Sequence, residues 1–251
     1  MRLSALPALS DNYIWLLADA AGQALVVDPG EAAPVEAALA HDGLRLRAIL
    51  LTHHHNDHIG AAAELAARHA ATVIAPHDPR IPSADRRVGG GDRVALPAPA
   101  ADFEAIAVPG HTLTHIAYAG EGVLFCGDTL FSLGCGRLFE GTPAQMLASL
   151  DRLAALPDAT RVCCGHEYTL ANAAFALTVE PDNPALHARI AEARAQRAAG
   201  RPTVPSTLAA ERAANPFLRT DAPAVAAWAA PAGTRVARFA ALRAAKDTFR
   251  A

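Results

Sequence analysis

Short runs of apolar residues alternate with turns and helical segments over the first two thirds of the chain. Eight of these runs are bounded by Gly, Pro or Asp, a pattern that predicts β-strands. The predicted strands are Tyr13–Ala18, Ala24–Asp28, Arg47–Thr52, Thr72–Ala75, Phe103–Val108, Ile116–Ala119, Val123–Cys126 and Arg161–Cys164. Helices are predicted at Pro34–His41, at Ile59–His69 with Asn56 and Asp57 as N-cap residues, and at Pro143–Ala155. This mixture indicates a layered domain of α/β or α+β type.

The pattern changes after about Tyr168, where helical segments replace the strand-like runs. Each segment is bounded by proline, glycine or an asparagine–proline pair. The predicted helices are Thr169–Glu180, Pro184–Ala199, Thr207–Ala214, Ala222–Ala230 and Thr234–Phe249. We therefore expect a domain boundary near residues 168–172. It divides a first domain, residues 1–168, from a small all-helical domain, residues 169–251.

The composition is that of a folded chain with a slight acidic excess. Hydrophobic residues make up 52% of the 251 residues, which is enough to bury a sizeable core. The formal net charge is −3, whereas proteins that bind nucleic acid usually carry a basic excess, so we expect no nucleic-acid partner. No apolar stretch approaches the roughly 18 residues of a membrane span, so we expect no membrane partner either.

The cysteines and the first residues of the chain bear on its location. The four cysteines lack the Cys-x-x-Cys spacing of zinc ribbons and redox motifs, which favours a reducing compartment without disulfides. They are Cys126, Cys135, Cys163 and Cys164. Residues 1–7 contain an early proline and no long apolar run, which argues against a signal peptide. We therefore expect a cytoplasmic protein, and we expect it to be a monomer.

A histidine-rich run directly follows the third predicted strand and reads His-His-His-Asn-Asp-His. Side chains two apart in an extended segment point the same way, so His53 and His55 can face one metal ion while His54 faces away. Asp57 and His58 lie where the chain turns into a helix, and they can reach a second ion. This spacing is specific, and it favours a metal site over the alternative of a solvated polar loop.

Further ligands are expected from loops that share one form, in which a strand is followed by glycine and then by histidine or aspartate. These loops contain Gly110-His111, Gly127-Asp128 and Gly165-His166. Glycine lets the backbone approach an ion closely, and strand ends place the side chain rigidly.

The candidate ligands divide between two ions. One ion is expected to bind His53, His55 and His111, the other Asp57, His58 and His166, and Asp128 can bridge both. Imidazole and carboxylate ligands suit zinc, iron or manganese, and zinc is our first expectation. Two such ions lie ~3.5–4 Å apart and lower the pKa of bound water to about 7. Asp57 and Asp128 are thus the expected catalytic carboxylates, and a metal-held hydroxide is the expected nucleophile.

Two residues are candidates for supporting the ligands. Asp28 ends an apolar strand before Pro29 and Gly30, where it is either a turn residue or a carboxylate that orients a metal-bound histidine. His54, which faces away from the ions in this scheme, is a candidate for the same supporting role. For the other histidines we expect structural or surface positions.

These features resemble the metallo-β-lactamase superfamily, and within it the glyoxalase II, or hydroxyacylglutathione hydrolase, family. The resemblance covers nearly the whole chain and extends into the helical part. It includes Ser10–Tyr13, Gly134–Arg137 with Glu140-Gly141, Cys164–Tyr168, Val204–Leu208 and Asn215–Arg219. It implies an αβ/βα sandwich with a dinuclear metal site, followed by a helical glutathione-binding domain.

The resemblance also implies which residues bind glutathione: the Arg137 region, Tyr168, Arg243 and Lys246. Arg243 and Lys246 are three apart on a predicted helix and can present two cations to carboxylates, with a solvated basic face as the alternative. The family commonly has lysine at the position of Arg137 and tyrosine at that of Phe139. The second difference removes a hydroxyl that could contact substrate.

The function implied is hydrolysis of S-(2-hydroxyacyl)glutathione thioesters, such as S-D-lactoylglutathione, as the second step of methylglyoxal detoxification. The main alternative is a glutathione persulfide dioxygenase with one iron, which shares the first domain but is disfavoured by the helical extension. A β-lactamase or a nuclease fits less well. A non-catalytic domain is a further alternative, although all seven ligand positions hold competent residues.

Overall fold

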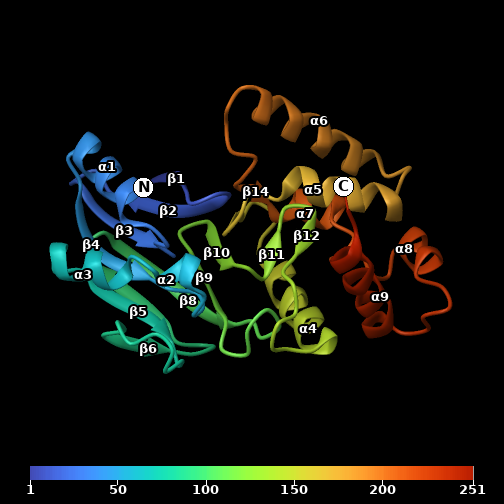
Figure 1. The fold of residues 1–251 in the computed structure, drawn as a ribbon, viewed down its shortest axis with the longest axis horizontal. Helices are drawn as coiled ribbons and strands as arrows, with labels where there is room; N and C mark the ends of the chain where they lie inside the picture. The colour runs from blue at the N-terminus through green and yellow to red at the C-terminus, as the bar shows by residue number, and fades with distance from the viewer. Residues whose placement is uncertain (251) are drawn as a thin grey trace. The chain divides into compact units, whose positions relative to one another are not determined.

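The structure is a computed structural model and describes residues 1–250. Contacts within the chain divide it into two compact units (Figure 1). Unit 1 comprises Met1–Ala107 and Thr114–Gly127, and unit 2 comprises Val108–Leu113 and the chain from Asp128 onward. Each unit is described by itself below.

Unit 1 begins with a six-stranded sheet in the order β1-β2-β3-β4-β5-β6. Its strands are β1 (Arg2–Ala8), β2 (Asn12–Ala18), β3 (Gln23–Val27), β4 (Arg45–Leu50), β5 (Thr72–Pro76) and β6 (Arg86–Val88). The pairs β1–β2 and β2–β3 are antiparallel, and the later pairs are parallel. The parallel strands therefore end at one edge, which is where the segments after β3 and β4 carry Asp28 and the histidine run.

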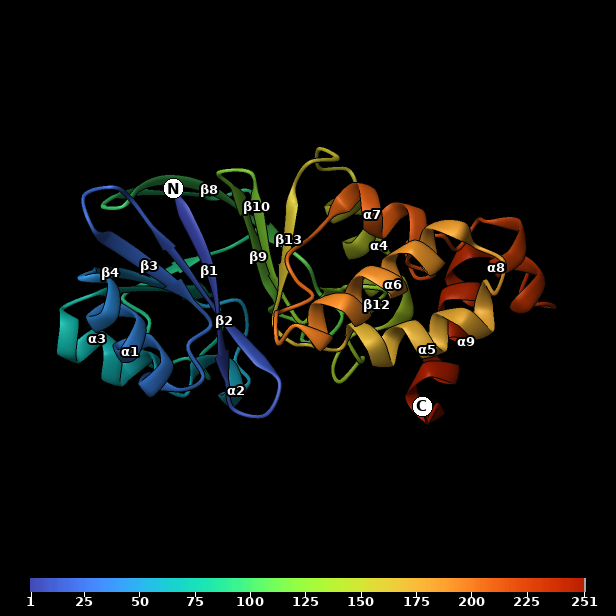
Figure 2. The ribbon, with the colours of Figure 1, turned by 90° about the horizontal axis from the view of Figure 1, so that it is seen from above.

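Helices α1 (Ala32–Asp42) and α3 (Ala62–His69) lie along one face of this sheet (Figure 2). They form there because apolar side chains recur at helical spacing and meet apolar side chains of the strands. Val35 and Leu39 of α1 and Leu65 of α3 share a core with Ile49 and Val73. Burial of this face stabilises the sheet whose end carries the histidine run.

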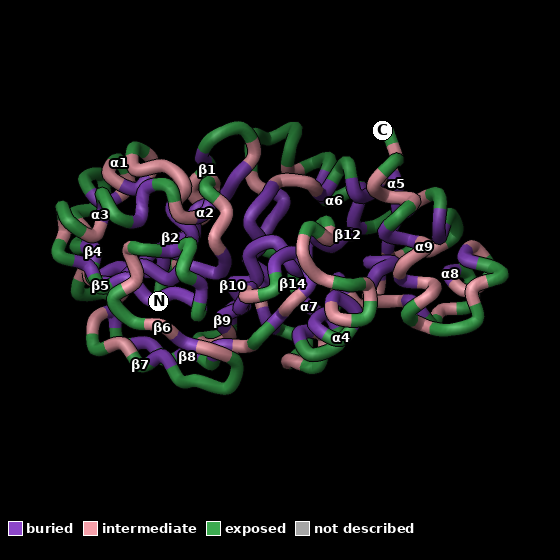
Figure 3. The backbone as a smooth tube through the Cα atoms, turned by 60° about the horizontal axis from the view of Figure 1, so that its bottom comes forward, coloured by how far each residue is buried: buried purple, intermediate pink, exposed green. Residues whose placement is uncertain are grey.

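The remaining strands of unit 1 form an antiparallel run, β7 to β10. They are β7 (Arg93–Pro97), β8 (Ala100–Ala107), β9 (Ile116–Gly120) and β10 (Val123–Gly127). Tyr118 of β9 joins this layer to the first sheet, because its buried hydroxyl donates to the carbonyl oxygens of Leu51 (3.0 Å) and Ile74 (3.2 Å). Strands β2 and β10 are buried along their whole length (Figure 3).

Unit 2 contains short strands and the helices of the C-terminal part. The strands are β11 (Leu130–Phe131), β12 (Gly134–Cys135), β13 (Arg161–Cys164) and β14 (Ser206–Thr207). The helices are α4 (Pro143–Ala154), α5 (Thr169–Val179), α6 (Pro184–Ala198), α7 (Leu208–Ala214), α8 (Pro223–Trp228) and α9 (Arg235–Thr248). Side chains of α5, α6 and α7 share a small apolar core, and Thr142, Asn183, Thr207 and Thr234 cap helix N-termini through their side chains.

The predicted helix Ile59–His69 is wrong in one respect, because the structure has two helices there, α2 (Asn56–Ile59) and α3. The chain turns aside after Gly60, where the amide of Ala61 donates to the carbonyl oxygen of Pro29 instead of continuing the helix (2.9 Å). Asn56 and Asp57 therefore lie inside α2 and are not N-cap residues. This break places Asp57 and His58 on a helix of their own.

Several strands lie outside the predicted set. These are β1, β6, β7, β11, β12 and β14. Strand β1 alternates only weakly, since residues 3–6 are all half-buried, and β11, β12 and β14 have two residues each. Such segments give little periodicity, and they are strands because a neighbouring strand pairs with them.

Candidate metal centre

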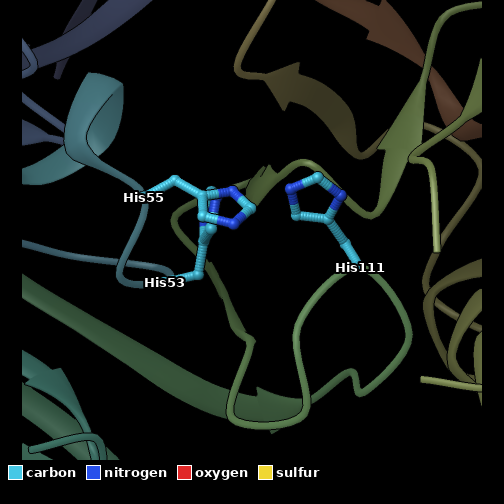
Figure 4. A group of neighbouring side chains, drawn as sticks. All are labelled: His53, His55 and His111. Atoms are coloured by element: carbon cyan, nitrogen blue, oxygen red, sulfur yellow. The ribbon is translucent and has the colours of Figure 1, made fainter. Parts of the chain in front are cut away.

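The histidine run of unit 1 leaves β4 and forms a compact group of ligand atoms. His53 and His58 are buried, with 0% and 1% of their surface exposed. His53 Nε2 and His55 Nδ1 lie 3.1 Å apart. Figure 4 shows these two rings against each other on the loop after β4, and it shows His111 on its own loop. His58 Nε2 lies 3.4 Å from Asp57 Oδ2.

Asp28 contacts this group through hydrogen bonds of its carboxylate. Its backbone is in the left-handed region, with φ of 53°, which aspartate tolerates better than most residues. The carboxylate accepts hydrogen bonds from the Thr52 amide (2.8 Å), the Thr52 hydroxyl (2.6 Å) and His58 Nδ1 (3.0 Å). This hydrogen bond fixes the orientation of the His58 ring and keeps the ring proton on Nδ1, from which it is donated to Asp28.

The same network fixes the ring of His53. The Thr52 hydroxyl has one proton, which it donates to Asp28, so it accepts a hydrogen bond from His53 Nδ1 (3.0 Å). His53 and His58 therefore both carry a proton on Nδ1 and a lone pair on Nε2, which is the form in which imidazole binds a metal ion.

His115 supports His53 by a contact that the sequence pattern did not reveal. The two rings stack with centroids 4.6 Å apart and planes 14° apart, and His115 Nδ1 donates to the carbonyl oxygen of Ile116. Gly127 allows this packing, since a Cβ there would lie 2.3 Å from the Thr52 hydroxyl and 2.8 Å from His115 Nε2. The sequence predicts a structural or surface position for His115, and the stacking against His53 is a contact that a lone histidine in a sequence does not reveal.

Unit 2 brings together His111, Asp128 and His166. His111 Nε2 lies 3.4 Å and His166 Nε2 lies 3.3 Å from Asp128 Oδ2. His111 Nδ1 donates to the carbonyl oxygen of Arg137 (2.8 Å), so its Nε2 also carries the lone pair. All three residues are buried, with 4% to 7% of their surface exposed.

A glycine makes the contact of Arg137 with His111 possible. A Cβ at Gly136 would lie 1.8 Å from the carbonyl oxygen of Asp128 and 3.3 Å from His111 Nδ1. The chain can therefore pass close enough to His111 for a main-chain carbonyl to set its tautomer. Sequence reasoning singled out the segment Gly134–Arg137 but missed this role of its backbone.

The separations of these ligand atoms fit metal coordination. Two ligand atoms on one tetrahedral ion at ~2.0–2.2 Å lie about 3.3–3.6 Å apart. The histidine–aspartate pairs His58–Asp57, His111–Asp128 and His166–Asp128 are separated by 3.4, 3.4 and 3.3 Å. These separations exceed the usual ~2.7–3.2 Å of an N–H···O hydrogen bond. Both the tautomers and the spacing therefore suit a divalent ion.

Unit 2 also contains a pocket of about 390 Å³ next to its ligands. The pocket is lined by His111 and Asp128, by the aromatic residues Phe131, Phe139 and Phe249, and by the four predicted glutathione-binding residues Arg137, Tyr168, Arg243 and Lys246. The ring of Tyr168 stacks on that of His166 with centroids 4.7 Å apart and planes 4° apart. The predicted substrate residues thus share one cavity with two predicted ligands.

The basic side chains that line this pocket, Arg137, Arg243 and Lys246, differ in their burial and in their hydrogen-bond partners. Arg243 is buried and donates to the carbonyl oxygen of Cys135 (2.7 Å) and to Asp247 (2.9 Å). Asp247 also meets Arg137, at 3.3 Å, so one carboxylate faces two guanidinium groups. The pKa of Lys246 is lowered, first by burial and then by the charge of Arg243. Arg243 thus lines the pocket with its guanidinium group already in contact with a main-chain carbonyl and a carboxylate.

The four cysteines are free and buried, in line with the expected absence of disulfides. Burial raises the pKa of Cys135, which lines the pocket, to about 11. Its thiol is therefore neutral at physiological pH and a poor nucleophile. Within residues 1–250, no helix combines the length and apolar character that crossing a membrane requires.

Comparison with known proteins agrees with the fold and the ligand groups. Residues 9–166 match the family model of the metallo-β-lactamase superfamily. The solved structure of ETHE1 from Myxococcus xanthus is 26% identical, with a TM-score of 0.67 over 99% of this chain and 91% of that chain. TTHA1623, solved in a di-iron-bound form, is 30% identical, with a TM-score of 0.55 over 66% of this chain and 92% of that chain. The chain therefore belongs to the metallo-β-lactamase superfamily.

The helical part narrows the assignment. Residues 167–249 match the family model described as the hydroxyacylglutathione hydrolase C-terminus. A hydroxyacylglutathione hydrolase from Xanthomonas euvesicatoria pv. vesicatoria (strain 85-10) is 57% identical over 256 residues, which cover 100% of both chains. Within the superfamily, the chain belongs to the hydroxyacylglutathione hydrolase family. The predicted family and fold class, an αβ/βα sandwich with a C-terminal helical region, are confirmed, and the hydrolase is favoured over the persulfide dioxygenase.

The contacts of Asp28 lead to a first prediction. Asp28→Asn keeps the shape of the side chain but removes the carboxylate that holds His58 and Thr52, so the affinity for zinc should fall by roughly 10–100-fold. Competition with a chromophoric chelator measures this affinity. Asp182→Asn, at an exposed position between α5 and α6, is the matched control and should bind zinc like the wild type. Equal zinc affinity in Asp28→Asn and wild type would contradict the orienting role.

Proposed function

We propose that this chain hydrolyses S-(2-hydroxyacyl)glutathione thioesters and converts S-D-lactoylglutathione to D-lactate and glutathione, the second step of methylglyoxal detoxification. The observation that carries the proposal is the pocket of unit 2. It joins the residues expected to bind glutathione to the ligands His111 and Asp128. Family membership supports the same reaction, since the relatives over the full chain length are named hydroxyacylglutathione hydrolases.

The proposed centre holds two divalent ions, with zinc as the first candidate. Each unit supplies part of the ligand set: His53, His55, Asp57 and His58 from unit 1, and His111, Asp128 and His166 from unit 2. We assign His53, His55 and His111 to one ion, Asp57, His58 and His166 to the other, and Asp128 to both. The di-iron form of TTHA1623 makes iron the second candidate.

The residues of the chain have distinct parts in the reaction. Bound divalent ions would polarise the thioester carbonyl and lower the pKa of water from ~15.7 to about 7. Asp28 and the main chain of Arg137 hold His58 and His111 in the tautomer that binds such ions. Arg137 and Lys246 supply positive charge for the carboxylates of the glutathionyl group. The leaving thiol needs little acid assistance, because a thiol is already acidic, with a pKa of ~8.5.

The location, oligomeric state and partners of the protein are proposed from its sequence. A cytoplasmic, monomeric enzyme accords with the four free cysteines and with the small glutathione thioester expected as substrate. The net charge of −3 disfavours nucleic acid as a partner.

Activity with one defined substrate tests the proposal. Zinc-loaded protein should hydrolyse S-D-lactoylglutathione. The reaction is measured by the loss of thioester absorbance and by an enzymatic assay of D-lactate. A strong chelator should abolish it. Oxygen consumption with glutathione persulfide is measured in parallel, on zinc- and iron-loaded samples. No hydrolysis by fully loaded protein would refute the proposal, and oxygen consumption in its place would favour the dioxygenase.

Phe139 yields a prediction about substrate affinity. Its side chain lines the pocket, is 61% exposed, and lies with its ring centroid 5.2 Å from that of His111. Phe139→Tyr adds a hydroxyl where the family commonly has one, and a hydrogen bond to substrate of about 0.5–1.5 kcal/mol would lower KM by about two- to twelve-fold. Phe139→Leu, which adds no hydroxyl, should not lower KM. An unchanged KM in Phe139→Tyr would contradict this account.

A further inference from the structure

We propose that Asp78 is a positioning residue of the metal centre, which acts through His54 to present His53 and His55 to one ion. Asp78 lies between β5 and β6 in unit 1, and sequence reasoning assigned it no role. The inference rests on the proposed assignment of His53 and His55 to one ion. It adds a second supporting carboxylate, distinct from Asp28, which contacts a ligand directly.

Asp78 is a buried carboxylate with an unusual number of contacts. Its side chain is 0% exposed. Oδ1 accepts hydrogen bonds from the Arg80 amide (2.9 Å) and from Arg80 Nε (2.9 Å), and Oδ2 meets Arg80 Nη2 (2.8 Å). The hydrogen bonds from Arg80 hold the pKa of Asp78 well below its usual range, so the carboxylate is charged at physiological pH. A buried charge of this kind is costly unless it is paired, and Arg80 supplies the pairing.

The remaining contacts of Oδ2 lead to the ligand segments. His54 Nδ1 lies 3.4 Å from Oδ2, and the Thr114 hydroxyl donates to the same oxygen (2.5 Å). His54 is flanked by the proposed ligands His53 and His55, and Thr114 follows the proposed ligand His111 by three residues. One carboxylate oxygen therefore meets both His54, which lies between two proposed ligands, and Thr114.

Ring contacts explain how a contact with His54 acts on its neighbours. The ring centroids of His54 and His55 lie 4.7 Å apart, and those of His53 and His55 also lie 4.7 Å apart, so the position of the His54 ring bears on both proposed ligands. His54 is suited to this role because its side chain is only 14% exposed. With Asp28 holding Thr52 and Asp78 meeting His54, the run is supported on both sides of His53.

A zinc-binding measurement on Asp78→Asn tests this inference without substrate. The variant keeps the shape of the side chain and loses its charge. We expect the affinity for one of the two zinc ions to fall by roughly 10–100-fold and the affinity for the other to stay within about two-fold of the wild type. Competition with a chelator measures both affinities. The visible spectrum of the cobalt-substituted protein should change for one ion only. In the zinc enzyme kcat should fall, while KM stays near that of the wild type, because the substrate pocket lies in unit 2.

Asp85→Asn is the matched control. Asp85 lies on the same β5–β6 connection, and its carboxylate accepts a hydrogen bond from the Val73 amide (2.8 Å). Loss of this contact perturbs the connection without touching His54, so both zinc affinities should stay within about two-fold of the wild type. Equal losses in Asp85→Asn and Asp78→Asn would show a merely structural role and overturn the inference, as would wild-type affinity for both ions in Asp78→Asn.

A second variant covers the case in which Asp78→Asn does not fold. His54→Phe keeps a ring at this position and removes the nitrogen that meets Asp78. It should weaken the same ion, and the double variant should bind zinc no more weakly than the weaker single variant, since both substitutions break one contact. Wild-type zinc affinity in His54→Phe would overturn the inference. Wild-type protein that binds two zinc ions but leaves S-D-lactoylglutathione intact would refute the proposed function alone.

Discussion

The hydrogen bonds of the buried Asp28 carboxylate are the contacts on which the ligand group of unit 1 depends. One side chain accepts from the Thr52 amide, the Thr52 hydroxyl and His58 Nδ1. It thereby sets the tautomers of His58 directly and of His53 through Thr52. The left-handed backbone of Asp28 at the end of β3 makes this possible, because it turns the carboxylate toward the end of the neighbouring strand β4. Asp28 thus combines an uncommon backbone conformation with hydrogen bonds to a candidate ligand and to Thr52.

Unit 2 uses main-chain groups for a similar purpose. The carbonyl oxygen of Arg137 sets the tautomer of His111, and the amide of Phe139 donates to the carbonyl oxygen of His111 (3.3 Å). Arg137 and Phe139 also line the pocket of unit 2, so the segment that contacts His111 forms part of the pocket wall as well.

The sequence alone predicts the fold class correctly, because most strands and helices carry alternating or helical periodicity. The candidate ligands also have a strong local signal, since His111, Asp128 and His166 each follow a glycine at the end of a strand, and their binding of metal stays a prediction. The residues that support the ligands were harder to find. Asp28 had two open interpretations, and Asp78 and His115 had none that involved the metal, because their roles arise from contacts with residues far away in sequence. Arg137 contacts His111 through its backbone, which no residue type encodes.

The proposed function requires two ions bound by the candidate ligands as assigned above. X-ray diffraction from crystals of the zinc-loaded enzyme, collected on both sides of the zinc absorption edge, locates the ions without reference to activity. We expect two anomalous peaks, one coordinated by His53, His55 and His111 and the other by Asp57, His58 and His166, with Asp128 bound to both. A single peak, or peaks coordinated by other residues, would contradict this assignment.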